Sequence, residues 1–246
     1  ARSSTRSLMS KIAVWYYDKF IAPKYINKFD KILAITKWEI PYLIKLEIKK
    51  EKIIYLPNGI PDEFLKQKKS KARNGILFLG RISPIKNLEI LIEAMSFIKN
   101  KKIKLEIVGP AEENYLKKLK LLIKSLKVES KIIFFKPIYN LKEKIKKIDS
   151  CQIFVLPSKS EGMPWSLIEA MARGKIVIGS NILAIRDLIK DKENGFLFEF
   201  NNPRDLAKKI DEALQQKNSG IKKQARKSVE NFSWDKIIRK IVEILQ

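Results

Sequence analysis

The sequence contains no histidine and a single cysteine, Cys151, among its 246 residues. The absence of histidine excludes a Ser-His-Asp triad, a Cys-His pair and any histidine-based metal site. One thiol cannot form a disulfide within the chain, and the apolar stretch SCQIFVLP around Cys151 favours a buried core position. Any chemistry must therefore come from carboxylates, lysines, arginines and backbone dipoles.

Long apolar runs are also missing. Apolar runs such as IIFF at 132–135 have the length of a strand, whereas a membrane-spanning helix needs about 20 apolar residues. The chain opens with ARSSTRSLMSK, which shows no secretory signal and does not begin with methionine. We therefore expect a cytoplasmic protein that is a fragment or a trimmed form of a longer chain.

Acidic residues are few relative to basic ones. Lys and Arg number 51 against 27 Asp and Glu, which gives a formal net charge of +24. A charge of this sign attracts nucleic acid, anionic lipid and phosphorylated small molecules. Because lysine is spread through every segment, the charge favours anionic substrates or surfaces, and we expect no nucleic-acid partner.

From about residue 75 onward, short apolar runs alternate with longer amphipathic ones. This alternation predicts an α/β fold, a Rossmann-like doubly wound parallel sheet with helices on both faces. Ligands of such sheets bind at the carboxyl ends of the strands, in the crevice where the strand order reverses. The predicted strands are 75–80, 103–109, 131–135, 152–158, 175–180 and 195–200, and the predicted helices are 87–99, 113–127, 140–148, 164–174, 184–189, 203–216, 219–230 and 234–245.

The first 60 residues have a different pattern. Residues 7–29 are typical of a helix interrupted at Pro23, and 30–36 and 51–59 are typical of strands. Two strands are too few for a complete second domain and predict the end of one. We divide the chain into this remnant (1–60), a polar linker (61–74), a main domain (75–231) and a terminal helix (232–246).

Two cations follow the first strand of the main domain. Arg81 lies just past the strand end, and Lys86 stands directly before the predicted helix. Two cations beside a helix N-terminus suit a diphosphate, although two solvated side chains in a lysine-rich chain would look the same. Gly109, at the end of the next strand, permits a ligand to approach the backbone, and a plain turn explains it equally well.

The stretch LPSKSEGMPWSLIEAMARG at 156–174 carries two carboxylates in the pattern Glu-x7-Glu. Glu161 lies in a strand-end loop, and the residues from Gly162 to Trp165 present backbone amides at the start of a helix, with Pro164 suited to the first turn. Two acceptor-only carboxylates at different depths suit a polyhydroxylated ligand such as a ribose. A capping role for Glu161 and a surface role for Glu169 remain equally open.

The position of Glu169 on its helix gives one further expectation. It shares a face with Trp165, four residues earlier. Leu167, Ile168 and Met171 occupy the buried face. We therefore expect the face of Glu169 not to be fully buried.

Together these stretches resemble the retaining glycosyltransferases of family 4, among the glycosyl transferases group 1. Their GT-B architecture consists of two facing Rossmann-like domains. The resemblance covers essentially the whole chain and implies a protein truncated at the N-terminus: 1–60 as the end of the acceptor-side domain, 75–231 as the nucleotide-sugar donor-binding domain, and 232–246 as a helix that crosses back to the N-terminal domain. It is carried by NGI (58–60), LGRISPIKN (79–87), IVGPAEENYLKKL (107–119), LPSKSEGMPWSLIEAMARGKIVIGS (156–180), NGFLFEF (194–200) and FSWDKIIRKIVEIL (232–245).

The resemblance implies a hexosyltransferase-type enzyme for glycan biosynthesis. It would use a UDP- or GDP-linked sugar as co-substrate, a glycan or lipid-linked acceptor, and neither a metal nor another cofactor. Arg81, Lys86 and Glu161 would be its catalytic residues, the cations on the diphosphate and Glu161 on the sugar hydroxyls, while Glu169 would bind the ribose. The implied donor-binding residues are Gly80, Arg81, Lys86, Gly109, Glu161, Gly162, Met163, Pro164, Trp165 and Glu169.

Two departures from the family pattern qualify this expectation. The segment SNILAIRDLI at 180–189 lacks the paired glycines common there, and Trp165 replaces a small aliphatic residue, which would narrow the sugar pocket. A phosphorylase or an epimerase on the same plan is disfavoured, because no additional phosphate site and no histidine are present.

The main alternative is a non-catalytic GT-B-like module that docks anionic lipid or a partner subunit. The aromatic, basic stretch 8–29 favours peripheral contact with an anionic membrane at its inner face. Packing against a missing domain explains this stretch as well. A bare scaffold has no need for the complete set of Arg81, Lys86, Glu161 and Glu169, which favours the enzyme.

Overall fold

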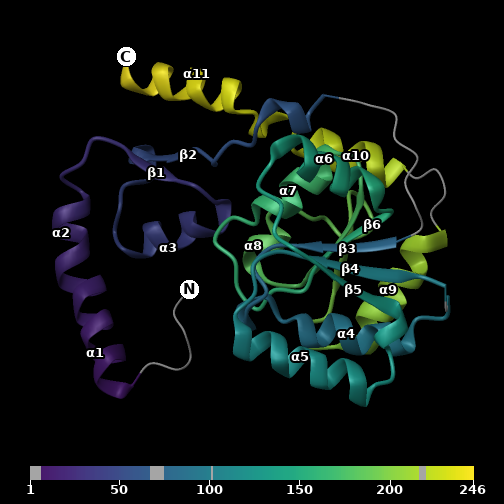
Figure 1. Cartoon of the computed structure of the whole chain (residues 1–246). Helices are drawn as coiled ribbons and strands as arrows, with labels where there is room; N and C mark the ends of the chain where they lie inside the picture. The colour runs from purple at the N-terminus through teal and green to yellow at the C-terminus, as the bar shows by residue number, and fades with distance from the viewer. Residues whose placement is uncertain (1–6, 67–74, 101, 216–219) are drawn as a thin grey trace.

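The computed structural model describes residues 7–66, 75–100, 102–215 and 220–246. Its main feature is a six-stranded sheet in which every pairing is parallel (Figure 1). This confirms the predicted α/β fold. The strands are β3 (Gly75–Leu79), β4 (Lys104–Val108), β5 (Ile132–Phe135), β6 (Ile153–Leu156), β7 (Ile176–Ser180) and β8 (Phe196–Phe198).

The strand order is β5-β4-β3-β6-β7-β8. The chain runs outward from β3 to β5, then crosses to the other side of β3 and runs outward again from β6 to β8. In register, Ile76 of β3 pairs with Leu105 on one side and with Ile153 on the other. The order therefore reverses between β3 and β6, and the crevice that binds ligands in doubly wound sheets lies at the carboxyl ends of these two strands.

Helices cover both faces of the sheet (Figure 1). One face carries α4 (Leu88–Phe97), α5 (Glu113–Ser125) and α9 (Pro203–Gln215), and the other carries α6 (Leu141–Ser150), α7 (Trp165–Ala172) and α10 (Gly220–Ser228). Strands covered on both sides are apolar throughout, and all four residues of β6 are buried. Cys151, just ahead of β6, is buried as predicted.

The helix ends follow local chemistry. The side chain of Asn140 accepts a hydrogen bond from the N–H of Glu143 at 3.1 Å and caps α6, as predicted. Gly174 ends α7 with a φ of +63°, and α9 begins at Pro203. The helix predicted from residue 87 begins one residue later, because Asn87 has the left-handed φ of +53°.

The N-terminal part forms its own small parallel sheet of β1 (Ile32–Ala34) and β2 (Ile53–Tyr55), with α3 (Ile40–Lys45) between them. Ahead of it lie α1 (Leu8–Tyr16), a π-helical turn (Tyr17–Ile21) and α2 (Ala22–Ile26). The predicted interruption of this helix is present, but it lies just before Pro23. The irregularity precedes the proline, which stands in the first turn of α2, where no intrahelical partner needs its missing N–H.

The terminal helix α11 (Trp234–Leu245) lies beside the N-terminal sheet (Figure 1). The ammonium of Lys240 donates to the carbonyl of Tyr55 in β2 at 2.7 Å, and Ser233 pairs with Ile60. Residues 67–74 of the predicted linker lie outside the described residues, as do positions 216 and 219 of two predicted helices. No helix in the described ranges combines the length and the apolar character that a bilayer span requires.

Candidate functional site

The loop after β3 is fixed against the end of β4. The N–H of Gly80 donates to the carbonyl of Val108 at 3.0 Å, and the N–H of Ile82 donates to that of Pro110 at 2.7 Å. Gly109 has a φ of +150°, and a Cβ added there would lie 1.9 Å from the carbonyl oxygen of Gly80. This position therefore requires glycine because two strand-end loops touch at it.

Lys86 and Glu161 reach one another from the loops after β3 and β6. The Nζ of Lys86 lies 2.6 Å from Oε1 of Glu161, and the two side chains are 20% and 9% exposed. The hydroxyl of Ser158 donates to the same oxygen at 2.5 Å. The loops are also joined through their backbones, since the N–H of Lys159 donates to the carbonyl of Ile85 at 2.8 Å. An ion pair thus stands at the reversal point of the sheet.

A third strand supports this pair. Ser180, the last residue of β7, donates its hydroxyl proton to the carbonyl of Ser158 at 2.6 Å. Ser158 and Ser180 are both fully buried, so the contact fixes the loop that carries Glu161. The carboxyl ends of β3, β6 and β7 therefore meet around one carboxylate.

Arg81 is the cation next to this cluster that has no partner. Its side chain is exposed, and within the described part of the chain it forms no hydrogen bond or ion pair. Because Gly80 and Ile82 on either side are bound to the β4 loop, the backbone of Arg81 is held while its guanidinium remains available to a ligand.

The N-terminus of α7 lies open beside Glu161. Pro164 is the N-cap residue, one position before its predicted place in the first turn, and its carbonyl accepts the N–H groups of Leu167 and Ile168. The first amides of a helix have no intrahelical partner. A Cβ built at Gly162 has no heavy atom within 4 Å, and Trp165 is 49% exposed, while Met163 is partly buried. The start of this helix is accessible to an anion.

Glu169 contradicts the expectation of an incompletely buried face. It is 3% exposed, whereas Trp165 on the same face is open. The difference arises because Lys144 of the parallel helix α6 covers Glu169, with its Nζ 2.6 Å from Oε1. Among the described residues, no hydrogen bond or ion pair joins Glu169 to the Lys86–Glu161 pair.

The environment of the Glu169 carboxyl raises its pKa. Burial is the main cause, and the charge and hydrogen bond of Lys144 oppose it. The second oxygen, Oε2, is buried and accepts no hydrogen bond from any described residue. A buried acceptor without a donor is costly, so this oxygen suits a ligand that supplies a hydroxyl.

Sequence reasoning missed three residues of this arrangement. Ser158 stands three positions before Glu161, a spacing at which a hydroxyl bonds a neighbouring side chain, and this signal was available. Ser180 could be recognised from the sequence only as a polar residue at a strand end. Lys144 gave no signal, because its contact depends on the parallel packing of α6 and α7.

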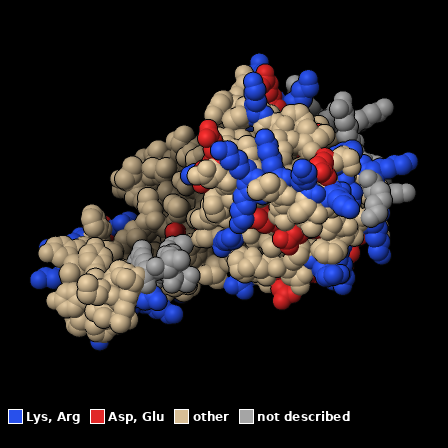
Figure 2. Space-filling model, turned by 60° about the horizontal axis from the view of Figure 1, so that its bottom comes forward, with Lys and Arg blue, Asp and Glu red and all other residues tan. Residues whose placement is uncertain are grey.

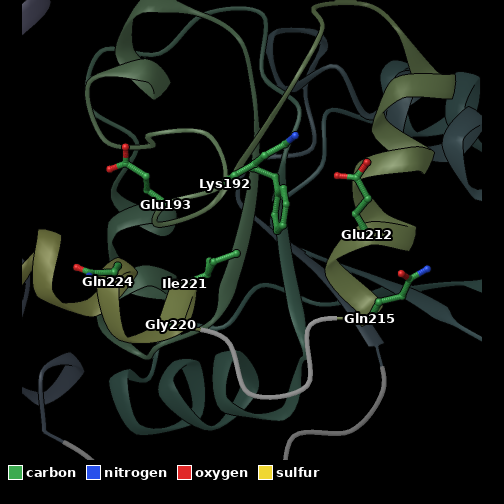
Figure 3. Close-up of a pocket in the computed structure, with 8 residues that line it drawn as sticks. Lys192, Glu193, Glu212, Gln215, Gly220, Ile221 and Gln224 are labelled. Atoms are coloured by element: carbon green, nitrogen blue, oxygen red, sulfur yellow. The ribbon is translucent and has the colours of Figure 1, made fainter.

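Among the described residues there is no candidate metal site, and the cavity beside β8 does not suit an anion. No group of three or more Cys, Asp or Glu side chains in the described residues is arranged to hold a metal ion. A cavity of about 660 Å³ lies by β8, α9 and α10 (Figure 3), and none of the predicted site residues lines it. Its charged walls are Lys192, Glu193 and Glu212, so acidic groups outnumber the single lysine and do not favour an anion.

The sequence family follows from a direct comparison. The model of the family described as glycosyl transferases group 1 matches residues 60–232. The chain belongs to this family. The match begins at Ile60, between β2 and β3, and it includes every predicted site residue of this glycosyl transferases group 1 member.

Curated relatives are named as glycosyltransferases. An uncharacterized glycosyltransferase of Haemophilus influenzae is 33% identical over 223 residues, which cover 89% of this chain and 60% of that protein. The putative colanic acid biosynthesis glycosyltransferase WcaL of Escherichia coli is 28% identical, with 91% of this chain and 59% of that protein covered. The chain therefore spans about 60% of the length of these relatives.

Solved structures agree with the fold. A glycosyltransferase from Rickettsia africae superimposes with a TM-score of 0.80 at 25% identity, covering 91% of this chain and 65% of that one. Anabaena HepE in complex with UDP gives a TM-score of 0.84 at 20% identity, with 99% and 69% covered. The likeness confirms the Rossmann-like fold of GT-B glycosyltransferases.

Proposed function

We propose that this chain contains the donor-binding half of a retaining, metal-independent family 4 glycosyltransferase. The enzyme transfers a hexose from a UDP- or GDP-linked donor to a glycan or lipid-linked acceptor. The observation that supports this most is the Lys86–Glu161 ion pair at the carboxyl ends of β3 and β6, where the strand order reverses. Arg81, which is free to bind a ligand, and the open start of α7 belong to the same loops. Since the chain spans about 60% of its relatives, transfer requires the part of the enzyme that it does not contain.

The cations suit a diphosphate. In a bound donor, Arg81 and Lys86 would face the phosphates, and the first amides of α7 would add the positive end of the helix dipole. Negative charge grows on the leaving diphosphate as the glycosidic bond breaks. Groups aimed at that charge lower the barrier without a metal ion.

The two carboxylates divide the recognition of the donor. Glu161 lies next to Lys86, so it would accept hydrogen bonds from the sugar hydroxyls while Lys86 reaches the phosphate attached to that sugar. Glu169, deeper in α7, would accept from the ribose through Oε2. The remaining donor contacts would come from the backbone around Gly80, Gly109 and Gly162, where no side chain intervenes.

Retention would follow from a front-face displacement. The bond between the anomeric carbon and the phosphate oxygen breaks, and the acceptor oxygen bonds to the same face of an oxocarbenium-like centre. The acceptor proton passes to the leaving phosphate oxygen, so no protein nucleophile is needed. The assignment of WcaL to colanic acid biosynthesis supports a polysaccharide acceptor, and the UDP bound to HepE supports a uridine donor.

One observation favours the second candidate, a module that docks on anionic lipid. Helix α1 exposes Leu8, Met9, Ile12 and Trp15, between 56% and 81% each. Either a membrane or the part of the relatives outside this chain would cover that face. Sedimentation with anionic and neutral vesicles separates the two, since only lipid docking predicts binding that depends on anionic lipid.

Calorimetric titration with UDP, GDP and ADP tests the donor-binding proposal. We expect one nucleotide to bind, and Arg81→Ala to weaken it about ten- to a hundredfold, the effect of losing a hydrogen bond between charged groups. Arg239→Ala is the matched control, because Arg239 is an exposed arginine of α11 without an ion pair among the described residues. Equal loss in both variants, or no binding of any of the three nucleotides, would contradict the proposal.

A further inference from the structure

Two ion pairs join α6 to α7, Lys144–Glu169 near the start of α6 (the upper pair) and Arg173–Asp149 near its end (the lower pair). They differ in how many carboxylate oxygens accept a hydrogen bond. In the lower pair, Arg173 donates from Nε to Oδ1 of Asp149 at 2.8 Å and from Nη2 to Oδ2 at 2.7 Å. Both carboxylate oxygens are therefore occupied. In the upper pair, Lys144 bonds only Oε1 of Glu169, at 2.6 Å. In the lower pair both carboxylate oxygens accept hydrogen bonds, whereas in the upper pair only one accepts a hydrogen bond from a described residue.

The incomplete pair is buried at the carboxylate and open at the cation. The side chain of Glu169 is 4% exposed and that of Lys144 is 24% exposed. The ammonium therefore lies between the carboxylate and solvent. Oε2 of Glu169 is buried and accepts no hydrogen bond from the described residues. Such an unsatisfied buried group in a folded protein indicates a function or a missing partner.

We propose that Lys144 is a positioning residue for nucleotide binding: its ammonium fixes Oε1 of Glu169, which leaves Oε2 to accept a ribose hydroxyl. This role rests on the proposed donor-binding function. It adds a residue of α6 to a site whose other side chains come from the loops after β3 and β6 and from α7. Lys144 also packs beside Phe64, 5.6 Å from the ring centroid, which limits the positions of its side chain.

Three cations on neighbouring segments have partners of their own. Arg173 is bound to Asp149, Lys175 donates to the carbonyls of Asp149 and Cys151, and the guanidinium of Arg226 donates to the carbonyls of Ala172 and Leu65. The charged residues of α6 are Lys142, Glu143, Lys144, Lys146, Lys147 and Asp149; Arg173 and Lys175 lie between α7 and β7; and α10 carries Lys222, Lys223, Arg226 and Lys227. Among the described residues, only Lys144 donates a hydrogen bond to the Glu169 carboxylate.

Removal of Lys144 should make nucleotide binding depend on pH. Burial raises the pKa of Glu169, and Lys144 opposes that rise. Without the ammonium the pKa rises further, so the carboxyl is protonated at a higher pH and loses its acceptor character. Binding should then weaken as pH falls and recover as pH rises.

The test is calorimetric titration of the chain with UDP, GDP and their 2′-deoxy forms at pH 6 and pH 8. For the nucleotide that binds, Lys144→Met should weaken the affinity for the ribo form about tenfold at pH 6 and by a smaller factor at pH 8. It should also reduce the difference in affinity between the ribo and deoxy forms. Lys144→Arg should retain the wild-type pH profile. Lys146→Met, an exposed lysine of the same helix, controls for the lost charge. Wild-type affinity in Lys144→Met, or an equal loss for both forms at both pH values, would overturn the inference.

A second measurement separates this inference from the proposed function. Carbon-13 NMR titration of the glutamate carboxyls needs no nucleotide and should show a higher pKa of Glu169 in Lys144→Met than in Lys146→Met. An unchanged value overturns the role of Lys144 whether or not nucleotides bind. If the wild type binds neither nucleotide while the pKa moves as expected, the donor-binding function fails and only the Lys144–Glu169 coupling stands.

Discussion

At the scale of single residues, Gly109 determines how the loops after β3 and β4 meet. A methyl group there would collide with the carbonyl of Gly80, and the φ of +150° is strained for any other residue. We expect Gly109→Ala to lower the free energy of unfolding by about 1–3 kcal/mol and to displace Arg81, which weakens nucleotide binding. Urea denaturation and calorimetry measure the two effects.

Gly162→Ala is the matched control for this stability measurement, because a Cβ at Gly162 meets open space. Its free energy of unfolding should stay within about 0.5 kcal/mol of the wild type. Equal stability of Gly109→Ala and Gly162→Ala would show that the Gly80 contact is not required.

Cys151 gives a prediction about reactivity. Burial raises the pKa of its thiol to about 12, with the charge of Lys175 acting in the opposite direction. The thiolate is the reactive form, so the native protein should not react with a thiol reagent such as DTNB at pH 8, whereas the urea-unfolded chain should react fully. The unfolded thiol loses its proton near 9.0, so this group's contribution to stability falls as pH rises from 9.0 toward 12. Fast labelling of the folded chain would contradict this burial.

The site could be predicted at this scale only in part. Lys86 and Glu161 were both singled out from strand-end positions, and the topology brings them into contact because β3 and β6 are neighbours. The burial of Glu169 could not be read from its helical face, since the residue that covers it belongs to another helix. Periodicity describes which face a residue occupies, and it does not reveal what packs there.

At the scale of elements, Arg173 holds α6, α7 and the segment after β2 together. It binds Asp149 with two hydrogen bonds and donates to the carbonyls of Phe64 and Lys66. Removing one partner of a buried pair leaves the other charge uncompensated. We expect Arg173→Met to lower the free energy of unfolding by about 3–5 kcal/mol, measured by urea denaturation.

Lys190→Met provides the comparison for Arg173→Met. Lys190 pairs with Glu193 at 3.9 Å, and both side chains are more than two thirds exposed. Its loss should cost less than about 1 kcal/mol. Similar destabilisation by the two substitutions would mean that the buried Arg173 network contributes no more to the free energy of unfolding than an exposed ion pair does.

Most elements of the main domain were predictable because apolar runs and amphipathic periods follow directly from burial on both faces of the sheet. The β6 run from Ile153 to Leu156 and the α6 cap at Asn140 are examples. The helix before β1 was predicted together with an irregularity near Pro23, but its π-helical form at Tyr17–Ile21 was not. The order in which the strands pair could not be read from the strand sequences either; only the fold class indicates that it reverses.

At the scale of the whole molecule, the positive charge has no single location on the face that Figure 2 shows. Lys and Arg side chains lie scattered over the main body and the N-terminal part. The net charge of +24 therefore acts as a general attraction for anions. Specificity must come from the crevice, where particular cations are fixed beside particular carboxylates.

The most direct test of donor binding in this crevice is an NMR map of backbone amides during titration with UDP and GDP. The largest shifts should fall on 80–87, after β3, and on 162–166, at the start of α7. Shifts confined to the cavity between Lys192 and Gln224, or none at all, would contradict a donor site between β3 and β6.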